Sequence, residues 1–258
     1  MDRIRQHAFS RELMDASTPL LKRVLGRRPH DSAEIEAWRV ANRASMSISE
    51  RYTWSVLGVM FAFHRVIERE RAARTLILVS PARLRGTSGK LDRADWIEYH
   101  LSAHAVALTS LSDLCLHLTN RVYQLGLAPR YCKLDVITSN ASISRTPIAK
   151  KLRALEKVLG DQKQRRNRYL HQGDEADIGS FTDAGFALDL KGLSVVQRVQ
   201  PSPEIANILR QGWRWILRDL KPVLDAAAEA ATEAVLPCFD AVHPRFTLTL
   251  AALQRAEA

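Results

Sequence analysis

The amino-acid sequence predicts an all-α protein, and three observations lead to that prediction. The 258 residues include 11 glycines and 10 prolines, too few for the many turns of an all-β chain of this size. Hydrophobic residues make up 46% of the chain, which is enough for a substantial core and excludes a disordered polypeptide. Two long segments repeat apolar residues at intervals of three or four, which is the period of an amphipathic helix.

The first third of the chain contains three segments that we expect to be helical, residues 11–25, 33–44 and 51–73. The run Leu76-Ile77-Leu78-Val79 is compatible with a short strand. Residues 81–90 hold Gly86, Thr87, Ser88 and Gly89 and are the best linker in the chain. We therefore predict two domains, a helical extension over residues 1–85 and a helical bundle over residues 86–258.

The first long helix is predicted to begin after Asp92, a suitable N-cap, and to end near Leu125, before Gly126. Its apolar positions follow a period near 3.6 and form a wide face. They are Trp96, Ile97, Leu101, Val106, Leu108, Leu111, Cys115, Leu118, Val122 and Leu125.

The second long helix is predicted to begin at Pro203, because proline suits the first helical position and Ser202 is a good cap. Pro222 should kink this helix, and Pro237 should end it. Both long helices would measure roughly 50 Å at 1.5 Å per residue. Since each has one apolar side, we expect them to pack against each other.

A third helical stretch lies between the two long helices. It opens at Thr146-Pro147, carries apolar residues at Ile148, Leu152, Leu155 and Leu159, and should stop at Gly173. Whether Gly160 breaks this helix stays open from the sequence. Residues 186–196 could form a short hairpin around Lys191-Gly192.

The end of this third stretch carries an R-N-x-x-x-H pattern made by Arg166, Asn167 and His171. Asn167 and His171 are four residues apart and share one face of a helix. Three further cations surround the pattern, at Lys163, Arg165 and Arg168, in a chain whose net charge is +10. A surplus of that size favours partners rich in phosphate, such as RNA.

These three side chains suit the cleavage of RNA. An imidazole can take a proton from a ribose 2′-hydroxyl or give one to the leaving 5′-oxygen. A guanidinium can hold the phosphate and stabilise the charge that grows in the transition state. This chemistry requires no metal or other cofactor. One histidine cannot easily act as both acid and base in one step, so a second copy from another protomer would complete the site.

A simpler interpretation of the same residues is a basic helix end, since cations in the last turn are favoured by the helix dipole.

The pattern also resembles the signature of the HEPN superfamily, R-x4-6-H with Asn directly after the Arg, and the resemblance covers roughly residues 91–236. It implies an up-and-down bundle of four or five helices that dimerises with the signature helices facing each other. Many members of that family are metal-independent endoribonucleases of toxin–antitoxin or antiphage systems.

Carried onto this chain, the resemblance makes His171 the general acid or base, Arg166 the phosphate clamp and Asn167 the orienting residue. Lys163, Arg165 and Arg168 are then expected to bind RNA, and an antitoxin or defence protein is an expected partner. Some HEPN proteins have a tyrosine two positions after the histidine that is modified by a nucleotidyltransferase; Gly173 stands there in this chain, which counts against that version. Other members have lost catalysis and act as binding modules for nucleotide, RNA or protein.

Other candidate residues have simpler alternatives. Asp113 could act as a second layer behind the signature, although an ordinary helix-surface pair with His117 is favoured. His100 and His104 share the spacing of metal ligands, but no third ligand is evident and we expect polar-face or interface histidines.

Three cysteines form no pattern of a disulfide scaffold or zinc site. The start of the chain lacks a secretory signal and no apolar run is long enough to span a membrane, so we expect a cytoplasmic protein without membrane contact.

Overall fold

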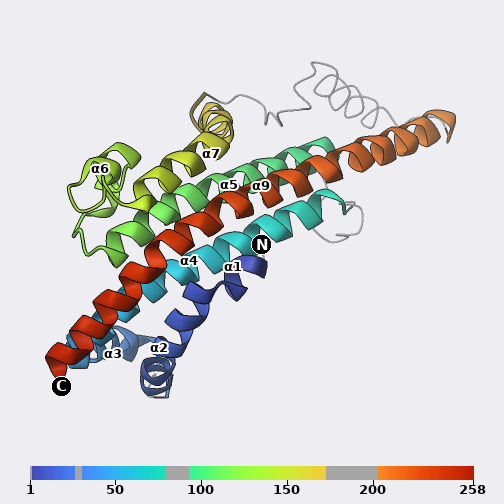
Figure 1. Ribbon diagram of the computed structural model, residues 1–258. Coiled ribbons are helices and arrows are strands. Elements are labelled where there is room, and N and C mark those ends of the chain that lie inside the picture. The colour runs from blue at the N-terminus through green and yellow to red at the C-terminus, as the bar shows by residue number, and fades with distance from the viewer. Residues whose placement is uncertain (1, 27–30, 80–92, 173–202) are drawn as a thin grey trace. The chain divides into compact units, whose positions relative to one another are not determined.

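The described residues of the computed structural model, 2–26, 31–79, 93–172 and 203–258, are helical apart from short turns (Figure 1). No strand occurs in these ranges, so the predicted all-α class is confirmed. The elements in chain order are α1 (Asp2–Gln6), α2 (Ala8–Leu25), α3 (Ser32–Ser45), α4 (Ile48–Ile77), α5 (Arg93–Val122), the short 3-10 helix η2 (Pro129–Tyr131), α6 (Leu134–Ser139), α7 (Pro147–Gln172) and α9 (Pro203–Glu257).

The chain divides into two compact units, each built from parts of several helices. Unit 1 comprises Met1–Arg65, Leu111–Glu156 and Thr232–Ala258. Unit 2 comprises Val66–Ser110 and Lys157–Ala231. The predicted domain boundary at residue 85 lies outside the described residues and stays a prediction.

Unit 1 is held together by an aromatic core between α2, α4 and α9. Phe239 of α9 meets Phe9 and Phe63 edge-on, with ring centroids 5.5 and 5.2 Å apart. Phe246 of α9 meets Phe9 edge-on and stacks on Tyr52. The four phenylalanines are fully buried. The hydroxyl of Tyr52 donates to the carbonyl of Val122, which joins the start of α4 to the end of α5.

Unit 2 packs the second half of α4 against the first half of α5, with α7 and α9. The indole nitrogen of Trp96 donates to the carbonyl of Leu76 over 2.8 Å, so the end of α4 lies beside the start of α5. Ile97, Leu108 and Leu220 are among the buried apolar residues of this unit.

The two predicted internal helices form nearly as expected. α5 begins at Arg93, directly after the predicted cap, and ends at Val122. α7 runs from Pro147 to Gln172 without a break. Gly160 therefore does not interrupt the helix, and a Cβ there would meet no atom within 4 Å.

Two expectations about helix ends are wrong. The run at residues 76–79 is not a strand, because α4 continues to Ile77, which is fully buried, before a turn. Pro237 does not end the last helix, since α9 continues to Glu257. The lost hydrogen bond of an internal proline costs about 3 kcal/mol. Here the apolar stripe continues beyond it, through buried Cys238, Phe239, Val242, Phe246 and Leu250, and its burial offsets that loss. The predicted hairpin at 186–196 lies outside the described residues.

One segment of the described residues, Trp96–Val122, is long and apolar enough to cross a membrane by length and composition. Its most apolar window is 61% buried inside the protein. Burial of that extent is typical of a core helix of a soluble protein.

Candidate functional site

The candidate site lies near the carboxyl-terminal end of α7, in unit 2. The helix forms here because its earlier turns bury Leu152, Leu155 and Leu159 on one side. The hydrogen-bonded backbone then continues through the R-N-x-x-x-H pattern to Gln172. The pattern is therefore carried on a regular helix, as the sequence predicts.

Arg166 is half-buried and its guanidinium is fixed from two sides. On one side, Nη1 donates to Oγ1 of Thr109 on α5 over 3.3 Å. Thr109 is fully buried, and its own hydroxyl lies 2.9 Å from the carbonyl of Ala105 one turn back along α5. The threonine therefore sends its proton to its own helix and offers a lone pair to the arginine.

On the other side, Asn167 accepts two hydrogen bonds from the same guanidinium. Its Oδ1 lies 3.2 Å from Nε and 3.0 Å from Nη2 of Arg166. All three nitrogens of Arg166 are thus engaged, which fixes the plane of the guanidinium before any ligand arrives. With its oxygen used in this way, exposed Asn167 keeps the Nδ2 group as the donor that a phosphate oxygen could accept from.

The remaining residues of the pattern are placed by the backbone alone. His171 follows Asn167 by one helical turn on α7, but its side chain lies outside what the structure describes. The same holds for the side chains of Arg165 and Arg168, whereas Lys163 is half-buried. The approach of the His171 imidazole to Arg166 therefore stays a prediction.

Asp113 belongs to unit 1, whereas Arg166 belongs to unit 2. In unit 1 its carboxylate acts on His117, four residues further along α5. The pKa of His117 is lowered by burial, and the negative charge of Asp113 opposes that shift. This interaction is the helix pair expected as the simpler alternative, and the second role of Asp113 stays a prediction.

A buried charged cluster in unit 2 was not foreseen from the sequence. Glu70 of α4 is fully buried, and its Oε1 lies 3.1 Å from Nε of Arg74 and 3.3 Å from Nδ1 of His104. Arg74 also pairs with Asp225 of α9. We refer to Glu70, Arg74, His104 and Asp225 as the Glu70 cluster.

The histidines at 100 and 104 are correspondingly not polar-face residues, since 6% of His100 and 4% of His104 are exposed. Burial lowers the pKa of His100, and Trp96 packs on its ring with centroids 4.3 Å apart. No group of three or more His, Cys, Asp or Glu suited to a metal ion occurs in the described part of the chain. The i,i+4 spacing of Glu70 with Arg74 is the one sequence signal that could have pointed to this cluster.

Comparisons with protein-family models, curated proteins and solved structures find no match to this chain. The interpretation of the site therefore depends on the residues themselves.

Proposed function

We propose that the protein is a metal-independent endoribonuclease of the HEPN type, with a composite site of Arg166 and His171 at a homodimer interface. The observation that supports this proposal best is the double anchoring of Arg166 by Thr109 and Asn167. Transition-state stabilisation is strongest from groups that are already oriented before the charge develops. A cation held in that way, five residues before a histidine on the same helix, suits phosphodiester cleavage.

The reaction would proceed by attack of the ribose 2′-oxygen on the adjacent phosphate. The imidazole of one His171 takes the proton of a ribose 2′-hydroxyl, and the 2′-oxygen attacks phosphorus. Arg166 and the amide of Asn167 bind the phosphate oxygens on which negative charge accumulates. The bond from phosphorus to the 5′-oxygen breaks, and that oxygen takes a proton from the second His171. The products are a 2′,3′-cyclic phosphate and a free 5′-hydroxyl.

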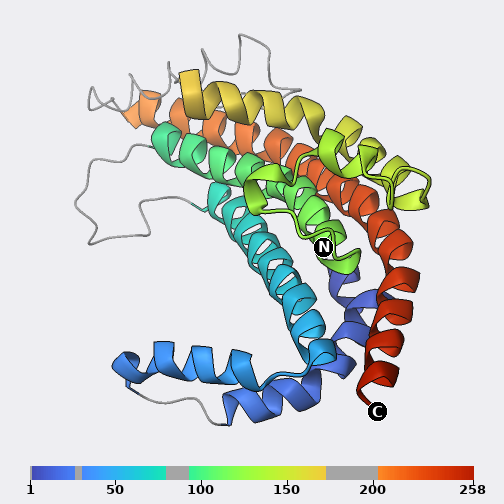
Figure 2. The same cartoon turned by 90° about the vertical axis from the view of Figure 1, so that its left-hand side faces the viewer.

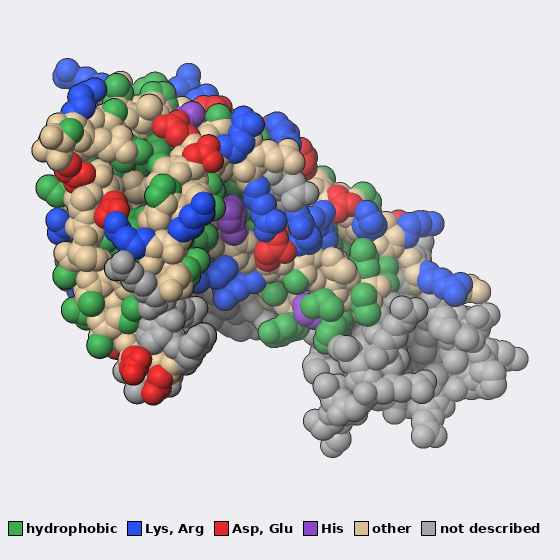
Figure 3. Space-filling view, turned by 90° about the horizontal axis from the view of Figure 1, so that it is seen from below, with side chains coloured by type: hydrophobic (Ala, Val, Ile, Leu, Met, Phe, Trp, Pro, Cys, Tyr) green, Lys and Arg blue, Asp and Glu red, His purple; other side chains and the backbone are tan. Residues whose placement is uncertain are grey.

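Charge around the site supports binding of RNA. Lys163, Arg165 and Arg168 accompany the pattern on α7, and the chain has a net charge of +10. Lys and Arg side chains are also spread across the face seen in Figure 3. We propose these three residues as backbone contacts, which carry affinity without sequence preference. A bacterial toxin or antiphage system, a protein partner that restrains the nuclease and a cytoplasmic location belong to the same proposal.

A second candidate function is a non-catalytic module of the HEPN type that binds nucleotide, RNA or a partner protein through the same helix face. The bond between Arg166 and buried Thr109 favours it, because that bond also ties α7 to α5 within unit 2. An arginine in this position can serve packing alone. This alternative predicts salt-sensitive binding without turnover.

The experiment that separates the two functions is cleavage of RNA in the presence of EDTA. The wild-type protein is expected to cut, whereas His171→Ala and Arg166→Ala are expected to lose activity by about a hundredfold or more. Arg153→Ala, at an exposed position earlier on α7, is the matched control for loss of a cation and should keep activity. Cleavage that persists in both site variants, or no cleavage of any RNA tested, would rule out the nuclease.

A further inference from the structure

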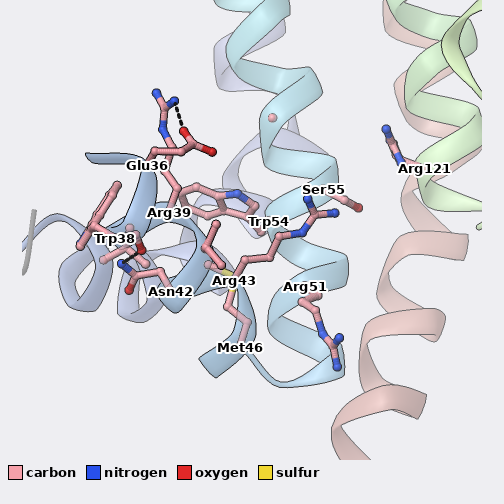
Figure 4. A pocket seen from close by; sticks show the side chains of 13 residues that line it. Glu36, Trp38, Arg39, Asn42, Arg43, Met46, Arg51, Trp54, Ser55 and Arg121 are labelled. Carbon is pink, nitrogen blue, oxygen red and sulfur yellow. Dashed lines mark hydrogen bonds and ion pairs between the residues drawn. The ribbon is translucent and has the colours of Figure 1, made fainter. Parts of the chain in front are cut away.

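A pocket with a volume of about 600 Å³ lies in unit 1, where α3 and α4 supply most of its lining. The proposed nuclease chemistry gives this region no role. Two side-chain types with complementary uses line the pocket (Figure 4): the tryptophans Trp38 and Trp54 and the arginines Arg39, Arg43, Arg51 and Arg121. Its volume falls in the range of roughly 300–1,000 Å³ that is usual for small-molecule sites.

Trp54 provides a flat apolar surface inside this pocket. Its indole is 36% exposed and lies in the space between α3 and α4 (Figure 4). Gly58 follows one turn later on α4 and also lines the pocket. A Cβ at Gly58 would meet no atom within 4 Å, so the wall beside the indole is open. An accessible indole beside open space can stack with a planar aromatic ring.

The opposite wall is anchored by Trp38. This side chain packs against the small apolar cluster of Leu20, Val24 and Met46, between α2 and α3. Figure 2 shows α2 and α3 as neighbouring helices. The side chain of Asn42 donates to the carbonyl of Trp38 over 2.9 Å and fixes the local backbone of α3. The pocket wall is therefore attached to the core.

The charge of the pocket is strongly positive. Arg39 is paired with Glu36 over 3.2 Å. Among the residues that the structure describes, the guanidinia of Arg43, Arg51 and Arg121 have no carboxylate in an ion pair. The Arg43 side chain extends from α3 toward α4 near Ser55 (Figure 4). Guanidinium groups are suited to phosphate because their donors match pairs of phosphate oxygens.

We infer that this pocket binds a nucleotide, with its base stacked on Trp54 and its phosphates held by Arg43 and Arg121. A planar ring linked to an anionic group is the chemistry that the lining recognises. An acidic peptide would use the cations but would leave the accessible indole without a ring to stack on. The site is independent of the proposed nuclease, because none of its residues belongs to the R-N-x-x-x-H pattern.

The test is calorimetric titration of the full-length protein with ADP and, in separate runs, with adenosine and with inorganic pyrophosphate. ADP is expected to bind. Adenosine and pyrophosphate are each expected to bind at least about tenfold more weakly than ADP. Equal binding of pyrophosphate and ADP would exclude a base site. Binding of an acidic peptide or of a single-stranded oligonucleotide, with none of ADP, would overturn the assignment to a nucleotide.

Variants locate the ligand in the pocket. Trp54→Ala should weaken ADP binding about tenfold or more, whereas Trp54→Phe keeps a ring and most of the affinity. Phe61→Ala is the matched control, because Phe61 lies on the same helix, is 37% exposed and does not line the pocket. Arg43→Gln should weaken ADP more than adenosine.

Gly58 offers a second test that adds atoms instead of removing them. Gly58→Leu places a side chain in the open space and should abolish ADP binding. Gly58→Ala also improves the helix but fills little of the pocket, so it should retain binding. Unchanged ADP affinity in both Gly58→Leu and Trp54→Ala, with folding confirmed by circular dichroism, would contradict the site.

Discussion

The two compact units place their charged groups in different ways. Unit 1 has an aromatic interior and keeps its ion pairs near the surface, as with Arg23 and Glu50, whose side chains are 38% and 27% exposed. Unit 2 buries Glu70 completely, with His104 beside it. Burying charge gives up stability that an apolar core would provide. The interior of unit 2, the unit that carries the R-N-x-x-x-H pattern, is therefore less stabilising than an apolar interior would be.

The largest expected effect comes from the aromatic core of unit 1. Phe239→Ala should lower the free energy of unfolding by about 3–5 kcal/mol, because it removes a fully buried ring that contacts Phe9 and Phe63 and leaves a cavity. Urea unfolding measures this loss. Leu248→Ala, at a 66% exposed position on the same helix, should change stability by less than about 0.5 kcal/mol. Similar losses in both variants would contradict the assignment of the core.

The next effect concerns the Glu70 cluster. Glu70→Ala should destabilise the protein by about 2–3 kcal/mol, because Arg74 and His104 then lose the carboxylate between them. The sharper test replaces charge with apolar volume. In a variant with Glu70→Leu and His104→Leu, much of the lost stability should return, because apolar packing replaces the buried carboxylate and the imidazole beside it. If the double variant is less stable than Glu70→Ala, the cluster stabilises unit 2 and the contrast between the units fails.

A smaller effect is expected where α4 begins in unit 1. Ser47 and Glu50 form a capping box: Oγ of Ser47 accepts from N of Glu50 over 3.2 Å, and Oε2 of Glu50 accepts from N of Ser47 over 3.0 Å. Ser47→Ala should cost about 1 kcal/mol in urea unfolding. Ser45→Ala, an exposed serine just before the cap, is the control. Equal stability of the two variants would show that the cap contributes little.

The smallest effect is a dependence on pH. Burial lowers the pKa of His100 below its ordinary value of 6.5. As the pH falls through 6.5, the unfolded chain takes up a proton that the folded histidine does not, so stability decreases on acidification. Burial lowers the pKa of His117 in the same direction. The urea concentration at the midpoint of unfolding should therefore decrease as the pH is lowered from 7.5 to 5.5.

The variant His100→Gln separates this histidine from the rest. In this variant the urea midpoint should decrease less between pH 7.5 and pH 5.5 than in the wild-type protein. A slope identical to that of the wild-type protein would show that His100 does not remain neutral in the folded state. Carboxylates act at lower pH: the hydrogen bond from Arg23 lowers the pKa of Glu50, and the stability from that pairing is lost only as the pH falls below the ordinary glutamate value of 4.5.

The sequence predicts helix boundaries that depend on residues close together in the chain. Asp92 and Pro147 are local signals, and α5 and α7 begin where these signals place them. Pro237 is also a local signal, but here the burial of Phe239 and Phe246 beyond it outweighs the lost hydrogen bond. Local rules therefore gave the starts of helices better than their ends.

Features made by two helices could not be read in the same way. The Arg166–Asn167 half of the candidate site follows from the motif, whereas Thr109 lies 57 residues earlier and carries no recognisable pattern. The Glu70 cluster likewise joins α4, α5 and α9. Such groups meet only when the helices pack, and spacing along one helix does not reveal which face meets which neighbour.

The most direct test of the nuclease is the chemistry of the RNA ends that form in EDTA, measured for the wild-type protein, Arg166→Lys and His171→Ala. We predict 2′,3′-cyclic phosphate and 5′-hydroxyl ends from the wild-type protein. We expect slower cleavage by Arg166→Lys, because an ammonium group cannot hold phosphate bidentately, and none by His171→Ala. Ends with a 3′-hydroxyl, or equal rates for the three proteins, would contradict the proposed function.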